Sequence, residues 1–263
     1  MPAALRLLAL AIVTVVSAVV VFRLPPIPQD PAYHRFADAR PLLGVPNFQN
    51  VASNVPFLIV GLIGLVRLRR RHAEPTDGTG PSETAAWFFL FLGIALTAFG
   101  SAWYHLAPSN ASLVWDRFPM SIAFTAFFAG LIGERIGQKA YRLLLWPLLG
   151  IGTASVLLWR ASELRGEGDL RLYVLVQFFP LLLIPLIMVL YAPRYTHGKY
   201  VFLALGGYAG AKVLEALDRP IYEISGHLTS GHTLKHLVAA GACWALLHMF
   251  SVREPAISLR PLD

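Results

Sequence analysis

Eight long apolar runs divide this chain, and they constrain its fold more than any other feature. They lie at about 5–22, 51–67, 85–106, 117–133, 143–159, 172–191, 200–217 and 232–250. An α-helix of roughly 17–25 apolar residues crosses the hydrocarbon core of a bilayer. Because backbone polar groups must be satisfied internally there, such runs form helices. The sequence therefore predicts an all-α polytopic membrane bundle with eight spans.

The overall composition supports this prediction. The chain has 263 residues, of which 56% are hydrophobic and 14% charged, and its mean hydropathy is +0.58. A soluble domain of this length needs more polar surface. The net charge of +7 would suit a nucleic-acid-binding protein, but the basic residues lie mostly in short segments between apolar runs, which is typical of a topology signal. We therefore expect an integral membrane protein without a nucleic-acid partner.

The ends of the chain define its predicted organisation. The run at 5–22 is followed by RLPPIPQDP, without a small-x-small cleavage pattern, which favours an uncleaved anchor helix at 1–24 over a removed signal peptide. Residues 25–250 are then a seven-span core domain, and 251–263 form a tail. The single cysteine, Cys243, excludes both an internal disulfide and a zinc cluster built from cysteines.

Basic residues in the connecting segments predict the orientation. The segments 67–72, 134–142, 193–199 and the tail after Met249 hold, together with Arg6, 12 Lys and Arg residues, against 8 in the alternate segments. By the positive-inside rule the first group is cytoplasmic. Both termini are therefore expected in the cytoplasm, and the charge pattern suits a bacterial inner membrane.

Five polar side chains are expected at the outer ends of three predicted helices. His232 and His236 are four residues apart and share a helix face, as do Ser101 and His105. Asp116 follows the turn APSNAS and is expected to open the next helix at the same depth. Burying such groups in a membrane is costly unless they pair or bind a metal. Three imidazoles with one open position are the ligand set of a catalytic zinc site, so the pattern predicts a metal centre.

Simpler roles remain open for some polar residues. Ser101 can bond back to the carbonyl of residue 97, and Asp116 can cap the helix that follows it. A second polar group lies at the outer end of the seventh run, comprising Lys212, Glu215, Asp218 and, from the eighth run, Lys235. Lys212 and Glu215 are three residues apart and can pair on one face. Alternatively, this group binds a polar headgroup beside the metal.

Two motifs resemble those of the alkaline ceramidases. These are GSAWYHLAPSNASLVWD at 100–116, with Ser-x3-His-x10-Asp spacing, and GHTLKHLVAAGACWALLH at 231–248, with His-x3-His spacing. The segment NFQNVASNVPFLIVG at 47–61 resembles the opening of that family's first core helix. The family belongs to a superfamily of seven-span membrane hydrolases that includes the progestin and adipoQ receptors. The resemblance covers about residues 30–250, which leaves the helix at 5–22 as an addition.

The resemblance implies a function and assigns roles to residues. It implies Zn²⁺ bound by His105, His232 and His236, with Ser101 and Asp116 flanking the attacking water, and hydrolysis of an N-acyl lipid such as ceramide. Zinc supplies the nucleophile and polarises the carbonyl, while Asp116 would carry the proton to the leaving amine and Ser101 would orient the water or the oxyanion. The family also binds Ca²⁺ before its first core helix. The candidates at those positions here are Asp30, Asp38, Asn47 and Asn50.

Two other functions are compatible with the sequence. Histidines from two helices can hold a haem, as in b-type membrane cytochromes, although this leaves Ser101 and Asp116 without a role. A seven-span core also permits a receptor-like or transport function. The sequence shows no discontinuous helix or inverted repeat, which disfavours transport.

Overall fold

The computed structural model describes residues 1–73 and 83–256, and within them the chain forms helices and no β-strand. The long helices are α1 (Ala3–Arg23), α3 (Val55–Ala73), α4 (Thr84–Leu106), α5 (Asn110–Arg135), α6 (Gln138–Leu164), α7 (Arg171–Leu190), α8 (Lys199–Ala216) and α10 (Gly231–Val252). Three short helices lie between them: η1 (Pro31–His34), α2 (Phe48–Ala52) and α9 (Asp218–Ile224). The predicted all-α fold is confirmed.

The membrane spans follow from the length and apolarity of these helices. Six of them meet both conditions, and a seventh span is counted if α8 and α9, which are bent by 75° at Leu217, are taken as one. The long helix α5 is not among them, because charged residues lie in its second turn and at its end. Since α4, α6 and α7 pack around α5, these charges face protein rather than lipid. The eight predicted runs thus correspond to eight long helices, of which six or seven qualify as spans in the described residues.

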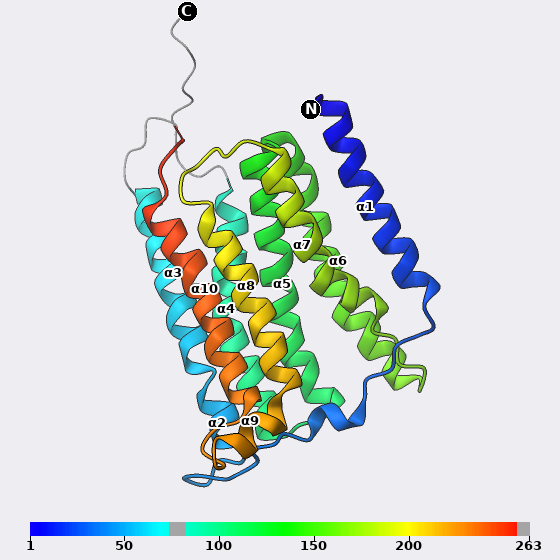
Figure 1. Cartoon of the computed structure of the whole chain (residues 1–263), viewed down its shortest axis with the longest axis vertical. Coiled ribbons are helices and arrows are strands. Elements are labelled where there is room, and N and C mark those ends of the chain that lie inside the picture. The colour runs from blue at the N-terminus through cyan, green and yellow to red at the C-terminus, as the bar shows by residue number, and fades with distance from the viewer. Residues whose placement is uncertain (74–82, 257–263) are drawn as a thin grey trace, which may run out of the picture.

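The helices lie nearly parallel and form a bundle with α1 at its edge (Figure 1). α4 packs against α3 and α5, α10 packs against α3 and α8, and α1 packs against α7. Leu10 is the only buried residue of α1, so this helix adds little to the core. The start of α1 and the end of α10 lie at the same end of the bundle, as the predicted topology requires (Figure 1). The opposite end holds α2, α9 and the segment that follows α1 (Figure 1).

The helix boundaries differ from the predicted ones at two points that affect function. α5 begins at Asn110 rather than at 117, because Ser109 and Ser112 form a capping box: the Ser109 hydroxyl accepts from the Ser112 N–H at 3.1 Å, and the Ser112 hydroxyl accepts from the Ser109 N–H at 3.0 Å. The prediction that Asp116 opens this helix is therefore wrong. The basic segment 67–72, predicted as a loop, continues α3.

The predicted tail begins as part of the bundle. Residues 251 and 252 still belong to α10, and the next residue, Arg253, is buried. Its guanidinium lies 3.3 Å from the Glu134 carboxylate and stacks over the Trp87 ring at 4.5 Å. The part of the predicted tail at 257–263 lies outside the described residues.

Candidate metal centre

The three predicted ligands converge at the end of the bundle that holds α2 and α9. His105 is in the last turn of α4, and His232 and His236 lie on one face of the first turns of α10. One ligand nitrogen of each lies within 4.8 Å of those of the other two, and all three residues are buried. Within residues 1–73 and 83–256 this is the one group of three or more His, Cys, Asp or Glu residues that satisfies this distance. The predicted convergence is confirmed.

The chemistry of these imidazoles fits a metal ion. Nδ1 of His105 and Nε2 of His232 are buried and have no hydrogen-bond partner. A buried polar atom without a hydrogen-bond partner lowers the stability of the fold by about 1–3 kcal/mol, and binding to a metal ion can remove this penalty. Nδ1 of His236 is hydrogen-bonded to the Ser53 hydroxyl at 2.8 Å, which fixes its ring. Three histidines without a thiolate are the ligands of known catalytic zinc sites, so this set fits Zn²⁺.

The start of α10 is held in place by hydrogen bonds that position two of the ligands. Ser230 caps the helix by accepting from the Thr233 N–H at 3.1 Å. Asp218 accepts from the His232 N–H and from the Ala37 N–H, both at 2.8 Å. A Cβ at Gly231 would lie 2.2 Å from the Leu214 carbonyl oxygen, so only glycine allows α10 to begin this close to α8. Asp218, predicted as a headgroup contact, therefore holds backbone here and does not line the cavity described below.

The four candidate calcium residues all have hydrogen-bond partners within the protein. Asp30 caps η1 through the Ala32 N–H, and Asp38 pairs with Arg40 at 2.8 Å. The hydrogen bond from Arg40 holds the pKa of Asp38 below its usual range, so this carboxylate stays charged at neutral pH. Asn47 donates a hydrogen bond to the His105 carbonyl at 2.8 Å. Asn50 donates to the Asp38 carbonyl and accepts from the Thr233 hydroxyl. These bonds tie the segment before α3 to the ends of α4 and α10, while calcium binding stays a prediction.

Ser101 and Asp116 lie where α4 and α5 pack closely together. A Cβ at Gly100 would lie 1.9 Å from the Trp115 carbonyl oxygen, so the missing side chain allows this approach. Ser101 and Asp116 both line the same cavity. Because Ser109 caps α5, the alternative role of Asp116 as a helix cap is wrong. Its carboxylate is instead available to a ligand in the neighbouring cavity.

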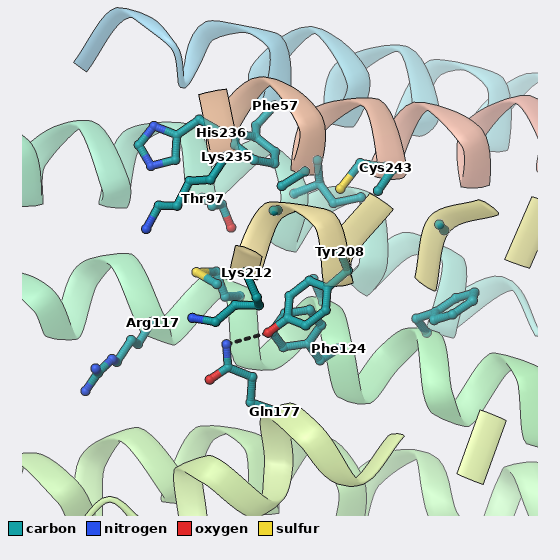
Figure 2. A pocket seen from close by; sticks show the side chains of 18 of the residues that line it. Phe57, Thr97, Arg117, Phe124, Gln177, Tyr208, Lys212, Lys235, His236 and Cys243 are labelled. Atoms are coloured by element: carbon teal, nitrogen blue, oxygen red, sulfur yellow. Dashed lines mark hydrogen bonds between the residues drawn. The ribbon is translucent and has the colours of Figure 1, made fainter. Parts of the chain in front are cut away.

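A cavity of about 280 Å³ lies beside His236, the one of the three histidines that lines it. Its polar end is lined by Ser101, Asp116, His236 and several charged residues. Along α10 it extends from Lys235 to Leu246, which corresponds to roughly 16 Å of helix at 1.5 Å per residue. In this direction the lining becomes apolar, with Phe57, Leu90, Phe127, Leu181, Ile184 and Leu246. Figure 2 shows His236 and Lys235 toward one end and Cys243 toward the other.

The second predicted polar group is partly confirmed as internal pairing. Lys212 and Lys235 both form ion pairs with Glu215, and all three line the polar end of the cavity. The simpler interpretation, that Lys212 and Glu215 pair on one face of α8, is therefore correct. The same residues remain accessible to a ligand.

Sequence reasoning missed three residues that shape the site. The Phe36 ring lies 4.7 Å from the His105 ring and 4.6 Å from the His232 ring, measured between centroids, and covers them on one side. Arg117 lines the cavity, and Ser53 orients His236. The sequence could have indicated Ser53 as a site residue, because it lies with two asparagines in an otherwise apolar run. No sequence pattern distinguishes Phe36, since a single aromatic residue in a connecting segment is common.

Comparison with protein-family models finds no family that matches this chain, and comparison with curated proteins finds no match. The resemblance to the alkaline ceramidases thus depends on the two motifs and the segment at 47–61.

Removing the Ser53 hydroxyl should weaken metal binding without removing a ligand. In Ser53→Ala the His236 imidazole loses the partner that fixes its orientation, and loss of such partners typically costs 10–100-fold in metal affinity. We expect a decrease of about that size in zinc affinity, measured by competition with a chelator. Ser155→Ala is the matched control, because this buried hydroxyl bonds only to the Gly152 carbonyl of its own helix. Equal zinc affinity in both variants would contradict the assignment.

Proposed function

We propose that this protein is a zinc-dependent membrane amidase that hydrolyses an N-acyl lipid, similar to the alkaline ceramidases. One observation carries the proposal: a cluster of three buried imidazoles, two of them with unpartnered nitrogens, borders through its third member, His236, a cavity that combines a polar end with a long apolar part. A pocket of this kind suits an amphiphile better than a polar metabolite.

The cavity supports a lipid as the substrate. Its apolar part is lined by residues from the middle of α4, α7 and α10, as an acyl chain would require. Its polar end lies beside His236, Ser101 and Asp116. An N-acyl lipid bound with its chain in the apolar part would therefore place its amide at the histidines.

The residues of the polar end fit amide hydrolysis. Zinc held by the three histidines would lower the pKa of water and polarise the amide carbonyl. Asp116 would accept a proton from the attacking water and deliver it to the leaving nitrogen. Ser101, which lines the same cavity as Asp116, would orient the attacking water or donate to the oxyanion. Phe36 would shield His105 and His232 from bulk water.

The charge pattern extends the proposal to orientation. The ends of α3 and α5 and the segment before α8 carry the basic residues predicted for the cytoplasmic side, and the histidines lie at the other end of the bundle. We therefore place both termini in the cytoplasm and the site toward the outer leaflet, in a bacterial inner membrane.

The alternative functions are less well supported. The ring centroids of the three histidines are 4.9–5.1 Å apart, and Phe36 packs against two of them, which leaves no gap for a porphyrin between any two imidazoles. The bend between α8 and α9 is a discontinuity that we did not expect from the sequence, but among the described residues it holds no group of three His, Cys, Asp or Glu residues close enough to share an ion. A receptor-like function would leave Asp116 and Ser101 without a role.

Hydrolysis by the purified protein tests the proposal directly. We expect about one zinc per chain and release of fatty acid from at least one lipid in a panel of ceramide, N-acylethanolamine, N-acylglycine and N-acyl phosphoethanolamine. A chelator should abolish release and added Zn²⁺ should restore it. Zinc-loaded protein that leaves the whole panel intact would overturn the proposed function.

A further inference from the structure

Three cationic side chains extend into the polar end of the cavity from three helices. They are Arg117 of α5, Lys212 of α8 and Lys235 of α10, and all three line the cavity. Figure 2 shows them reaching toward the same end, where His236 also lies. Clustering of cations inside a membrane bundle is costly unless they meet negative charge.

The two lysines share a single carboxylate. Both Lys212 and Lys235 form ion pairs with Glu215, and the Tyr33 hydroxyl donates to the same side chain at 3.1 Å. Burial and the nearby Glu215 carboxylate raise the pKa of Tyr33, so this phenol stays a neutral donor. Two ammonium groups opposite one carboxylate leave one positive charge without a counter-charge.

Arg117 is buried without a carboxylate partner. Its guanidinium stacks over the rings of Trp159 at 4.4 Å and Tyr173 at 4.8 Å, and Nη2 donates to the neutral amide of Gln29. Nη1 is buried and has no hydrogen-bond partner. No ion pair of Arg117 occurs among the described residues. A buried guanidinium in this state has an unused, fixed donor available for an anion.

The charges at this end of the cavity do not balance. Arg117, Lys212 and Lys235 supply three positive charges, and Glu215 and Asp116 supply two negative ones. A neutral ligand would displace water and leave the excess cation in a poorly hydrated site. A carboxylate or a phosphate would instead pair with it through charge-assisted hydrogen bonds.

We propose that the substrate is an N-acyl lipid whose amine half carries a negatively charged group, a carboxylate or a phosphate, close to the amide. This inference rests on the proposed function, which places the acyl chain in the apolar part and the amide at the histidines. The amine half then occupies the cationic end. Hydrolysis breaks the C–N bond, with the hydroxyl of water going to the acyl carbon and a proton to nitrogen. The products are a fatty acid and an anionic amine.

Three ligands with the same palmitoyl chain test this assignment. They are N-palmitoylglycine, N-palmitoyl phosphoethanolamine and the neutral N-palmitoylethanolamine. Binding to the purified protein in detergent is measured by equilibrium dialysis at low temperature, with intact ligand and released amine quantified by mass spectrometry. We expect both anionic ligands to bind about tenfold or more tightly than the neutral one, as one added charge-assisted hydrogen bond implies.

The variant Lys212→Met links the preference to the cationic cluster. It leaves Lys235 paired one-to-one with Glu215, so the excess charge of this group disappears. The anionic preference should fall severalfold, whereas Lys199→Met, at the other end of α8, should keep it. Arg117→Met should also reduce the preference, but loss of its aromatic stacking can unfold the chain, so Lys212→Met is the primary test.

The outcomes separate this inference from the proposed function. Equal affinity for the three ligands, or a preference unchanged in Lys212→Met, would overturn the anionic assignment even if all three are hydrolysed. Inorganic phosphate that binds as tightly as N-palmitoyl phosphoethanolamine would overturn the assignment to a lipid. Anionic preference that depends on Lys212, with no hydrolysis of any of the three, would support the inference and count against the amidase.

Discussion

Replacing His236 with alanine should empty the metal centre. The parent protein is expected to retain about one zinc per chain after purification and desalting, because three neutral imidazoles form its ligand set. Loss of one ligand leaves two, and the effect should exceed the 10–100-fold decrease expected when only an outer hydrogen-bond partner is lost. His232→Ala should behave in the same way. The measurement is zinc per chain by elemental analysis in matched detergent samples.

His248→Ala provides the matched control for this experiment. His248 lies on the same helix, but it is exposed and packs against Tyr200, with 4.9 Å between the ring centroids. Zinc content should therefore equal that of the parent. Full zinc occupancy in both His232→Ala and His236→Ala would rule out the three-histidine centre, and with it the proposed chemistry.

The Asp116→Asn variant should lose most of its hydrolytic activity while keeping its zinc. The substitution preserves size and removes basicity, and general acid–base groups typically contribute 10²–10⁴-fold to the rate. We expect turnover of an accepted N-acyl lipid to fall by about that factor. Since the histidines are unchanged and Ser109 caps α5, zinc content should change little. Turnover and zinc are measured on the same samples.

A second aspartate at the same end of the bundle serves as the control. Asp169 pairs with Arg171 at 2.7 Å just before α7 and does not line the cavity. Asp169→Asn should therefore retain parent-like turnover. If zinc-loaded Asp116→Asn were as active as the parent, the mechanism would lack its base, and Asp116 would have only a structural role.

The sequence alone predicts the membrane bundle and the histidine centre because both depend on short-range regularities. A run of about 20 apolar residues must become a helix in lipid, whatever its neighbours are. The four-residue spacing of His232 and His236 places them on one helix face. Short connections between runs then return Ser101, His105 and Asp116 to the same end of the bundle. These features required no knowledge of side-chain packing.

Boundaries near the site were less predictable. Asp116 follows a turn, which suits a helix cap, but the Ser109–Ser112 capping box begins α5 seven residues earlier. Ser109 and Asp116 are both residue types that favour the N-cap of a helix, and their intrinsic capping preferences are similar. The bend between α8 and α9 was also missed, although Pro220, which has no backbone N–H to continue a helix, lies three residues after Leu217.

What the sequence by itself determined is therefore the all-α membrane bundle and the three candidate ligands, since spacing along a helix fixes which side chains share a face. Only the tertiary structure decided what surrounds them. Ser53 reaches His236 across 183 positions of sequence, and Phe36 covers two histidines from a connecting segment. Lys212 and Lys235 come to share Glu215, and Arg117 is left with a neutral partner. Contacts of this kind depend on how distant helices pack, and packing is a property of the whole chain rather than of any local pattern.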